Sequence, residues 1–122
     1  MRENSRKYLR KTGGDYEQIA ACFLEEQGYR ILGRNIYCRY GELDIVALDG
    51  AAVVFVEVKY RKSAAYGMPE EAVTPKKQRA IAVSAKWYLL KNGYGEDVPC
   101  RFDVVAILDG SIRHIKNAFT CG

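Results

Sequence analysis

The sequence predicts a single α/β domain with a mixed central β-sheet flanked by helices, in the order α-β-β-β-α-β-β. Two segments carry apolar residues at helical spacing, and five others are short runs rich in β-branched and aromatic residues, bounded by turn residues. The second helix lies between two such runs, and a strand–helix–strand unit joins parallel strands, whereas hairpins are antiparallel. A chain of 122 residues has the size of one domain with a proper core.

The first helix is predicted to follow a basic segment at residues 1–12. Thr12 to Asp15 form a helix start with Asp15 as the N-cap, and Gly28 ends the helix in the left-handed C-terminal position. An apolar stripe at i, i+3, i+4, i+7 and i+8 lies between them: Tyr16, Ile19, Ala20, Phe23 and Leu24. A connecting run at 29–34 then leads to a strand at about 35–40.

The next two strands are predicted at 42–48 and 52–60, around an Asp49-Gly50 turn typical of a hairpin. Residues 61–73 are predicted to form a loop.

The second helix starts with Thr74 as N-cap and Pro75 in the first helical position, and it runs to about Lys91. Its broad apolar surface is typical of a helix packed on a sheet. Strands at 102–108 and 112–115 complete the chain.

Composition excludes several classes of protein. Hydrophobic residues make up 48% and charged residues 28%, as in globular proteins. No apolar run approaches the roughly 20 residues of a membrane span, and the N-terminus lacks the apolar core of a secretory signal. The four cysteines are scattered singly and there is one histidine, which argues against a structural zinc site. We therefore expect a cytoplasmic protein with reduced thiols and no membrane partner.

Positive charge is concentrated in two segments. The net charge is +4, and residues 1–12 carry all of it, so they are predicted to form a flexible basic arm before a single domain at 13–122. Residues 59–91 hold eight bases against two acids. Such surfaces suit a polyanion, although a solvated tail and a solvated helix surface would give the same pattern. The candidate nucleic-acid-binding residues are Arg6, Lys7, Arg10, Lys11, Arg61, Lys62, Lys76, Lys77 and Arg79.

The central hairpin brings chemistry-bearing side chains together. Side chains alternate across a strand, so Glu57 and Lys59 share one face of the sheet. A hairpin loop of either two or four residues places Asp44 on that same face, as the diagonal neighbour of Glu57 or directly opposite it. Two facing carboxylates on apolar strands are costly unless something neutralises them.

A divalent cation would neutralise this pair, and hard oxygen ligands favour Mg²⁺ or Mn²⁺. Lys59 would then reach a metal-bound water or a phosphate. Glu17 borders the apolar stripe of the first helix and can lean toward the same point. The alternative interpretation is a cross-strand ion pair of Lys59 with Glu57 or Asp44.

Two segments, 41–47 (GELDIVA) and 55–61 (FVEVKYR), carry a resemblance to the YraN-type family of small bacterial proteins. The likeness extends to 14–28, to Tyr66-Gly67, to the helix start at 74–77 and to 101–105, and so covers most of residues 13–108. That family belongs to the PD-(D/E)XK nuclease superfamily and is similar to archaeal Holliday junction resolvases. The resemblance implies a restriction-endonuclease-like core. Leu43 stands where the superfamily has its namesake proline, a position that is loosely kept.

The resemblance also implies roles for individual residues. Asp44 and Glu57 would bind the metal, with the Val58 carbonyl as a further ligand. Lys59 would polarise the attacking water or stabilise the phosphorane, and Glu17 would be the helix acid beside the metal. Gln78 matches a polar position that often completes such sites, although it is equally a polar residue on the first turn of a half-exposed helix.

Two further acids are given structural interpretations. Asp103 begins a strand, where a cap or a sheet-end acid is preferred to a catalytic role. Glu42 shares the face of Asp44 but adjoins a turn, so it is interpreted as a solvated acid rather than a ligand.

The function expected from these observations is metal-dependent hydrolysis of DNA phosphodiester bonds, including those of branched or junction DNA. The alternatives are a non-catalytic nucleic-acid-binding module that keeps the nuclease fold, and a protein–protein adaptor. Cutting both strands of a four-way junction with one site per chain would require a symmetric homodimer.

Overall fold

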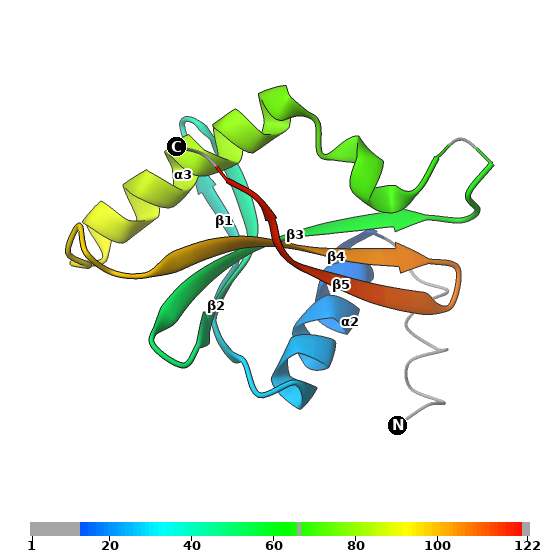
Figure 1. Cartoon of the computed structure of the whole chain (residues 1–122), viewed down its shortest axis with the longest axis horizontal. Helices are drawn as coiled ribbons and strands as arrows, with labels where there is room; N and C mark the ends of the chain where they lie inside the picture. Colours follow the sequence, from blue (N-terminus) through cyan, green and yellow to red (C-terminus); the bar gives the residue numbers. More distant parts are fainter. Residues whose placement is uncertain (1–12, 66, 121–122) are drawn as a thin grey trace.

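The computed structural model describes residues 13–65 and 67–120, and the basic arm therefore lies outside the described residues. A five-stranded sheet forms the centre of the molecule, with strand order β1-β2-β3-β4-β5 (Figure 1). In chain order the elements are α2 (Gly13–Glu26), β1 (Arg30–Cys38), β2 (Gly41–Asp49), β3 (Ala52–Arg61), the 3₁₀ helix η1 (Pro69–Ala72), α3 (Pro75–Lys91), β4 (Cys100–Leu108) and β5 (Ser111–Phe119).

The sheet is mixed, as the sequence predicts. Strands β1, β2 and β3 pair antiparallel, and so do β4 and β5, because short turns connect them. Strands β3 and β4 pair in parallel, since the chain crosses between them through η1 and α3. The predicted α/β class and element order are confirmed.

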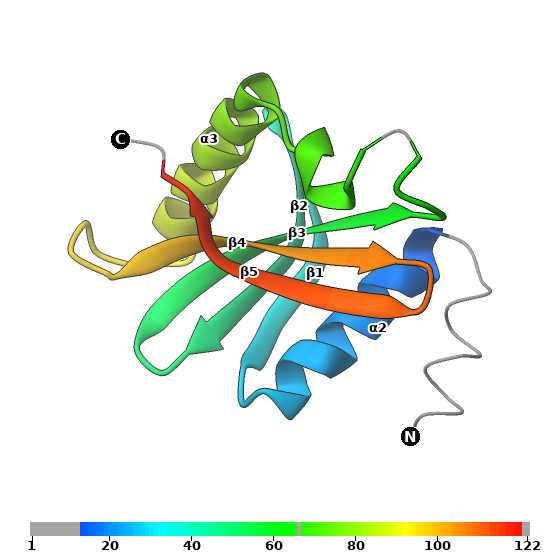
Figure 2. The same ribbon diagram turned by 45° about the vertical axis from the view of Figure 1, so that its right-hand side comes forward.

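The two helices cover opposite faces of the sheet (Figure 2). On one face α2 contributes Ile19 and Leu24 to a core with Val54 and Val105. On the other face α3 contributes Ile81 and Tyr88, which pack with neighbouring strand residues that point the opposite way, among them Phe55. Burial on both faces explains why the central strands are nearly continuous apolar runs rather than alternating ones.

The end of α2 and the start of α3 are formed by the predicted residues. Gly28 has φ +95° just after α2, a conformation that glycine adopts without steric cost. The Thr74 side chain accepts a hydrogen bond from the Lys77 backbone N–H, and Pro75 begins α3. Both helix assignments therefore rest on observed caps.

Several boundaries differ from the prediction. Helix α2 begins at Gly13, so Asp15 lies inside the helix rather than at its N-cap. Strand β1 begins at Arg30, five residues before the predicted start. A register shift at residues 31–33 breaks the alternation of side chains there, so the sequence does not show this part of the strand. Strand β5 runs to Phe119, and its pattern is broken by Asn117 at φ +53°. The loop after β3 contains η1, whose turn the sequence analysis missed.

Two predictions about the class of protein can be compared with the described residues. Among the described helices, none combines the length and the hydropathy needed to cross a membrane. Cys22, Cys38 and Cys100 are free thiols, while Cys121 lies outside the described residues.

Candidate functional site

Strands β2 and β3 place Asp44 and Glu57 beside each other. Their register runs from Asp49 opposite Ala52 to Ile45 opposite Val56, and one further step puts Asp44 opposite Glu57. The ladder ends there, and the Asp44 carboxylate accepts a hydrogen bond from the Val58 backbone N–H at 2.9 Å. Hydrogen bonding through the Asp44 side chain thus takes over where the strand pairing ends.

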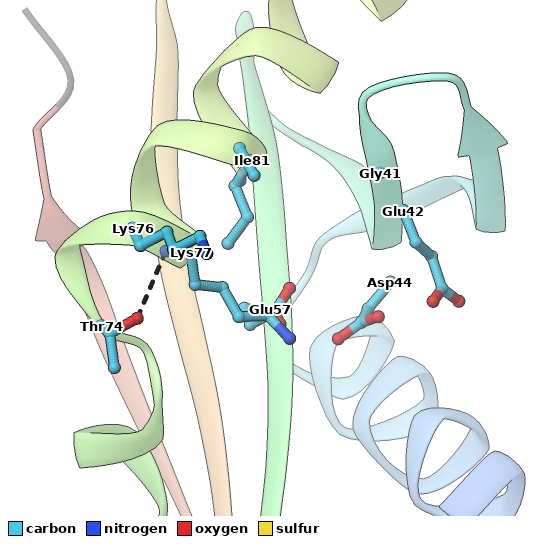
Figure 3. A pocket seen from close by; sticks show the side chains of 9 residues that line it. Gly41, Glu42, Asp44, Glu57, Thr74, Lys76, Lys77 and Ile81 are labelled. Atoms are coloured by element: carbon cyan, nitrogen blue, oxygen red, sulfur yellow. Dashed lines mark hydrogen bonds and ion pairs between the residues drawn. The ribbon is translucent and has the colours of Figure 1, made fainter.

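Asp44 also lies close to acids from the other side of the sheet. Leu43 packs in the α3-side core, whereas Ile45 packs in the α2-side core. Residues two apart on a regular strand share a face, so the alternation of side chains is broken at Asp44. Asp44 therefore lies between Glu57 on one side and Glu42 on the other (Figure 3). The first turns of α2 bring Glu17 to the same point, and carboxylate oxygens of Glu17, Glu42 and Asp44 lie within 4.8 Å of one another.

Burial and the neighbouring carboxylates raise the pKa values of Asp44 and Glu17. Burial, followed by the negative charge of Glu57, raises the pKa of Asp44 to about 7. Burial, followed by the charge of Asp44, raises the pKa of Glu17 to about 7. Both carboxyl groups therefore hold a proton more readily than ordinary carboxyl groups do.

Glu57 is buried and paired with two lysines. Its side chain is 4% exposed, and its Oε2 atom lies 3.5 Å from Lys59 Nζ and 3.1 Å from Lys77 Nζ. Lys59 follows on the same strand, whereas Lys77 reaches over from the first turn of α3 (Figure 3). Burial lowers the pKa of Lys59 from its ordinary value.

Glu57 and Lys77, but not Lys59, line a cavity of about 360 Å³ between the end of the hairpin and the start of α3. Its walls combine carboxylates with a helix N-terminal turn that carries two lysines, a polar environment for a charged ligand. The lining residues are Gly41, Glu42, Asp44, Glu57, Thr74, Lys76, Lys77, Ala80 and Ile81.

The other predicted site residues lie around this cavity or away from it. The Gln78 side chain donates a hydrogen bond to the Val73 carbonyl at 3.0 Å, and it does not line the cavity. Lys62 is exposed after the end of β3, with Arg61 half-buried at its last position, and Arg79 is exposed on α3. The arm residues Arg6, Lys7, Arg10 and Lys11 lie outside the described residues.

Asp103 belongs to a separate buried network on the α2 side of the sheet. Its carboxylate is fully buried and accepts hydrogen bonds from the Arg101 guanidinium and the Asn117 backbone N–H. It also lies 2.7 Å from His114 Nε2 and 3.4 Å from the Tyr29 hydroxyl. Asp103 is therefore a structural acid, as predicted, but it lies inside β4 and not at a strand start or sheet end, because β4 begins at Cys100. The network also gives His114 a partner.

One member of the site and one of its ion pairs do not follow from the sequence. Glu42, interpreted as a solvated acid, is exposed but joins Glu17 and Asp44. Lys77, predicted to contact nucleic acid, also pairs with Glu57. The shared face of Glu42 and Asp44 was a usable signal, whereas no pattern along the chain connects Lys77 to β3.

A divalent cation fits the chemistry of these side chains. Carboxylate oxygens are the ligands that Mg²⁺ and Mn²⁺ prefer, and the acidic triad of Glu17, Glu42 and Asp44 could hold one such ion. The Glu17 Oε1 atom is buried and has no hydrogen-bond partner among the described residues. A buried carboxylate oxygen normally contacts a cation or a hydrogen-bond donor, and a metal ion would fill this role.

Fold and site together define a class of protein. It is a small α/β protein with a mixed five-stranded sheet and a pocket of carboxylates and lysines at the point where the pairing of β2 with β3 ends. Residues 16–107 match the family described as "Uncharacterised protein family UPF0102". The chain belongs to this UPF0102 family of YraN-like small bacterial proteins, which confirms the resemblance at the level of the family.

Relatives of similar length share much of the sequence. A UPF0102 protein of Lachnoclostridium phytofermentans is 58% identical over 103 residues, which cover 84% of this chain and 87% of the relative. A UPF0102 protein of Geobacter sulfurreducens is 53% identical over 108 residues, covering 84% of each chain. A UPF0102 protein of Klebsiella pneumoniae is 42% identical over 119 residues, covering 97% of this chain and 93% of the relative.

Proposed function

We propose that this protein is a metal-dependent endonuclease that hydrolyses DNA phosphodiester bonds, with a restriction-endonuclease-like core of the PD-(D/E)XK superfamily. One observation carries the proposal. Asp44, Glu57 and Lys59 come together at the end of the central hairpin, and helix α2 adds Glu17. Carboxylates around one point beside a half-buried lysine are what metal-assisted phosphodiester hydrolysis requires.

Each side chain has a role in this proposal. Asp44 and Glu57 would hold a Mg²⁺ or Mn²⁺ ion, with Glu17, the Val58 carbonyl and Glu42 as further oxygen donors. Such an ion would lower the pKa of a bound water and offset phosphate charge. Lys59 donates to the phosphate oxygens where negative charge develops. Gln78 supports the first turn of α3 through Val73, and the lysines of that turn draw the DNA backbone toward the cavity.

A non-catalytic nucleic-acid-binding module is the second candidate. Lys59 and Lys77 already neutralise Glu57 without a metal, and α3 carries bases but no acid. A protein of this kind would bind DNA through its basic surface and keep the acids as an internal ion-pair cluster.

Replacement of Asp44 by Asn separates the two candidates. We expect the wild type to cut linear or branched DNA with Mg²⁺ or Mn²⁺, and the variant to cut at least about 100-fold more slowly, because an amide is a poorer ligand than a carboxylate. Cleavage is followed on labelled DNA, and Mn²⁺ binding by titration calorimetry. Lys86→Gln, which alters an exposed residue of α3, is the control for general damage.

The outcomes are distinct. Cleavage that needs the ion and is lost with Asp44→Asn supports the enzyme. A wild type that binds DNA but neither binds Mn²⁺ nor cuts DNA supports the binding module. Equal cleavage by wild type and variant would contradict the assignment of Asp44.

Deletion of residues 1–12 tests the basic arm. These residues carry five bases and one acid, so their loss is expected to weaken DNA binding and to flatten the dependence of log affinity on log salt. Each lost phosphate contact lowers the slope by about 0.9. The measurement is fluorescence anisotropy over a salt series, with Mn²⁺ calorimetry as the control that the site is intact. Unchanged affinity and slope would show that the arm is a solvated tail.

A further inference from the structure

Glu57 has one negative charge but two cationic partners. The ammonium groups of Lys59 and Lys77 both approach the same oxygen, Oε2, at 3.5 Å and 3.1 Å. A buried carboxylate needs compensation, and a single ammonium group supplies the charge that matches Glu57. The neighbouring Asp44 demands less of the second ammonium group, because burial and the charge of Glu57 raise its pKa. The second lysine is therefore available for exchange.

The two lysines differ in how easily they can leave. The Lys59 side chain is 22% exposed and is directed by the β3 backbone, two residues from Glu57. The Lys77 side chain is 43% exposed and starts from another element, the first turn of α3. Its flexible four-carbon stem lets the ammonium group swing into solvent without moving the helix. Lys77 is the partner that can exchange.

A divalent cation in the cavity would compete with these ammonium groups. It would add two positive charges next to a carboxylate that already faces two, and like charges at such distances repel strongly away from bulk water. Release of one ammonium group relieves that repulsion.

We propose that Lys77 is an exchangeable counter-ion of Glu57, which holds the carboxylate when no metal is bound and is displaced when a divalent cation binds. This inference rests on the metal site of the proposed function. The released ammonium group stays at the start of α3, beside Lys76 in the same cavity, where the helix terminus favours anions such as phosphate. Metal binding would thereby prepare a contact for the DNA backbone.

Competition predicts that removing Lys77 strengthens metal binding. We expect Lys77→Gln to bind Mn²⁺ about tenfold more tightly than the wild type, because no ammonium group has to be displaced. Lys77→Met keeps the apolar stem without the charge and should behave in the same way. Lys77→Arg keeps the charge and should return the affinity toward that of the wild type. A lysine that only supports the fold would give no gain in affinity on removal.

The experiment is titration calorimetry of the full chain with Mn²⁺ alone, with circular dichroism to show that each variant folds. The matched control is Lys86→Gln, which removes the same charge from the same helix nine residues further on, about 13 Å along its axis. Tighter binding by Lys77→Gln or Lys77→Met but not by Lys86→Gln supports the proposal, and so does binding that appears only in the Lys77 variants. A wild type that binds Mn²⁺ while the Lys77 variants match the control would overturn this inference alone. Absence of binding in every protein would overturn the metal site as well.

Discussion

Replacing Lys59 with alanine is expected to slow DNA cleavage by about 10²–10³-fold while Mn²⁺ binding is retained. Lys59 is a half-buried cation on the same strand as Glu57, 3.5 Å from its carboxylate, and the proposed function gives it the phosphate oxygens on which negative charge develops. A fixed positive charge in a site sheltered from water stabilises such a transition state more than one in bulk solvent. Single-turnover cleavage separates this effect from a change in DNA affinity.

The matched control for Lys59→Ala is Lys86→Ala, which removes a lysine from the C-terminal half of α3. The Lys86→Ala protein should cleave DNA at the wild-type rate. Cleavage by Lys59→Ala at the wild-type rate would reduce Lys59 to an ion-pair partner of Glu57, the alternative interpretation of the sequence pattern. Loss of both cleavage and Mn²⁺ binding would instead show that Lys59 is needed to keep Glu57 in place.

The parts of this fold that depend on local chemistry were predictable from sequence. The Asp49-Gly50 pair indicated the hairpin, and the parity of side chains placed Asp44 on the same face as Glu57. The pairing of Asp49 with Ala52 in the structure then puts Asp44 opposite Glu57, one of the two arrangements that the sequence left open. Thr74 and Pro75 identified the start of α3 because capping requires only residues close in sequence. The candidate site was therefore largely predictable on β2 and β3.

The parts that depend on tertiary contacts were not predictable. Strand β1 contains Asn35 at φ +51° and a register shift, so its residues resemble a connection more than a strand. The pairing of Lys77 with Glu57 depends on how α3 approaches the sheet, and no residue pattern on either element records that approach. Likewise the partners of Asp103 include Tyr29, 74 residues away in the chain.

Replacing Asp103 with alanine is expected to lower the free energy of unfolding by about 3–5 kcal/mol, because it leaves buried partners without their anion. Arg101 keeps a bond to Asp49, but His114 and the Asn117 backbone N–H lose theirs. Urea denaturation measures the loss, and Asp97→Ala, in an exposed loop position, should change stability by less than about 0.5 kcal/mol.

The pH dependence of the stability of Asp103→Ala is an independent test of the hydrogen bonds around Asp103. Although burial alone would raise it, the hydrogen bonds from His114 and Arg101 lower the pKa of Asp103 from 3.8 to about 2. A carboxyl group with a depressed pKa in the folded state stabilises the protein fully above its unfolded pKa, and this contribution is lost as the pH falls from about 4 through about 2. At about 1.4 kcal/mol per pKa unit, the shift corresponds to roughly 2.5 kcal/mol, and the wild type should lose about 2 kcal/mol of it between pH 4 and pH 2 through Asp103. Asp103→Ala lacks this contribution at every pH, so its stability should fall less steeply between pH 4 and pH 2, and the difference between the two proteins should shrink. Parallel curves over that range would show that Asp103 is not held as an anion by its partners.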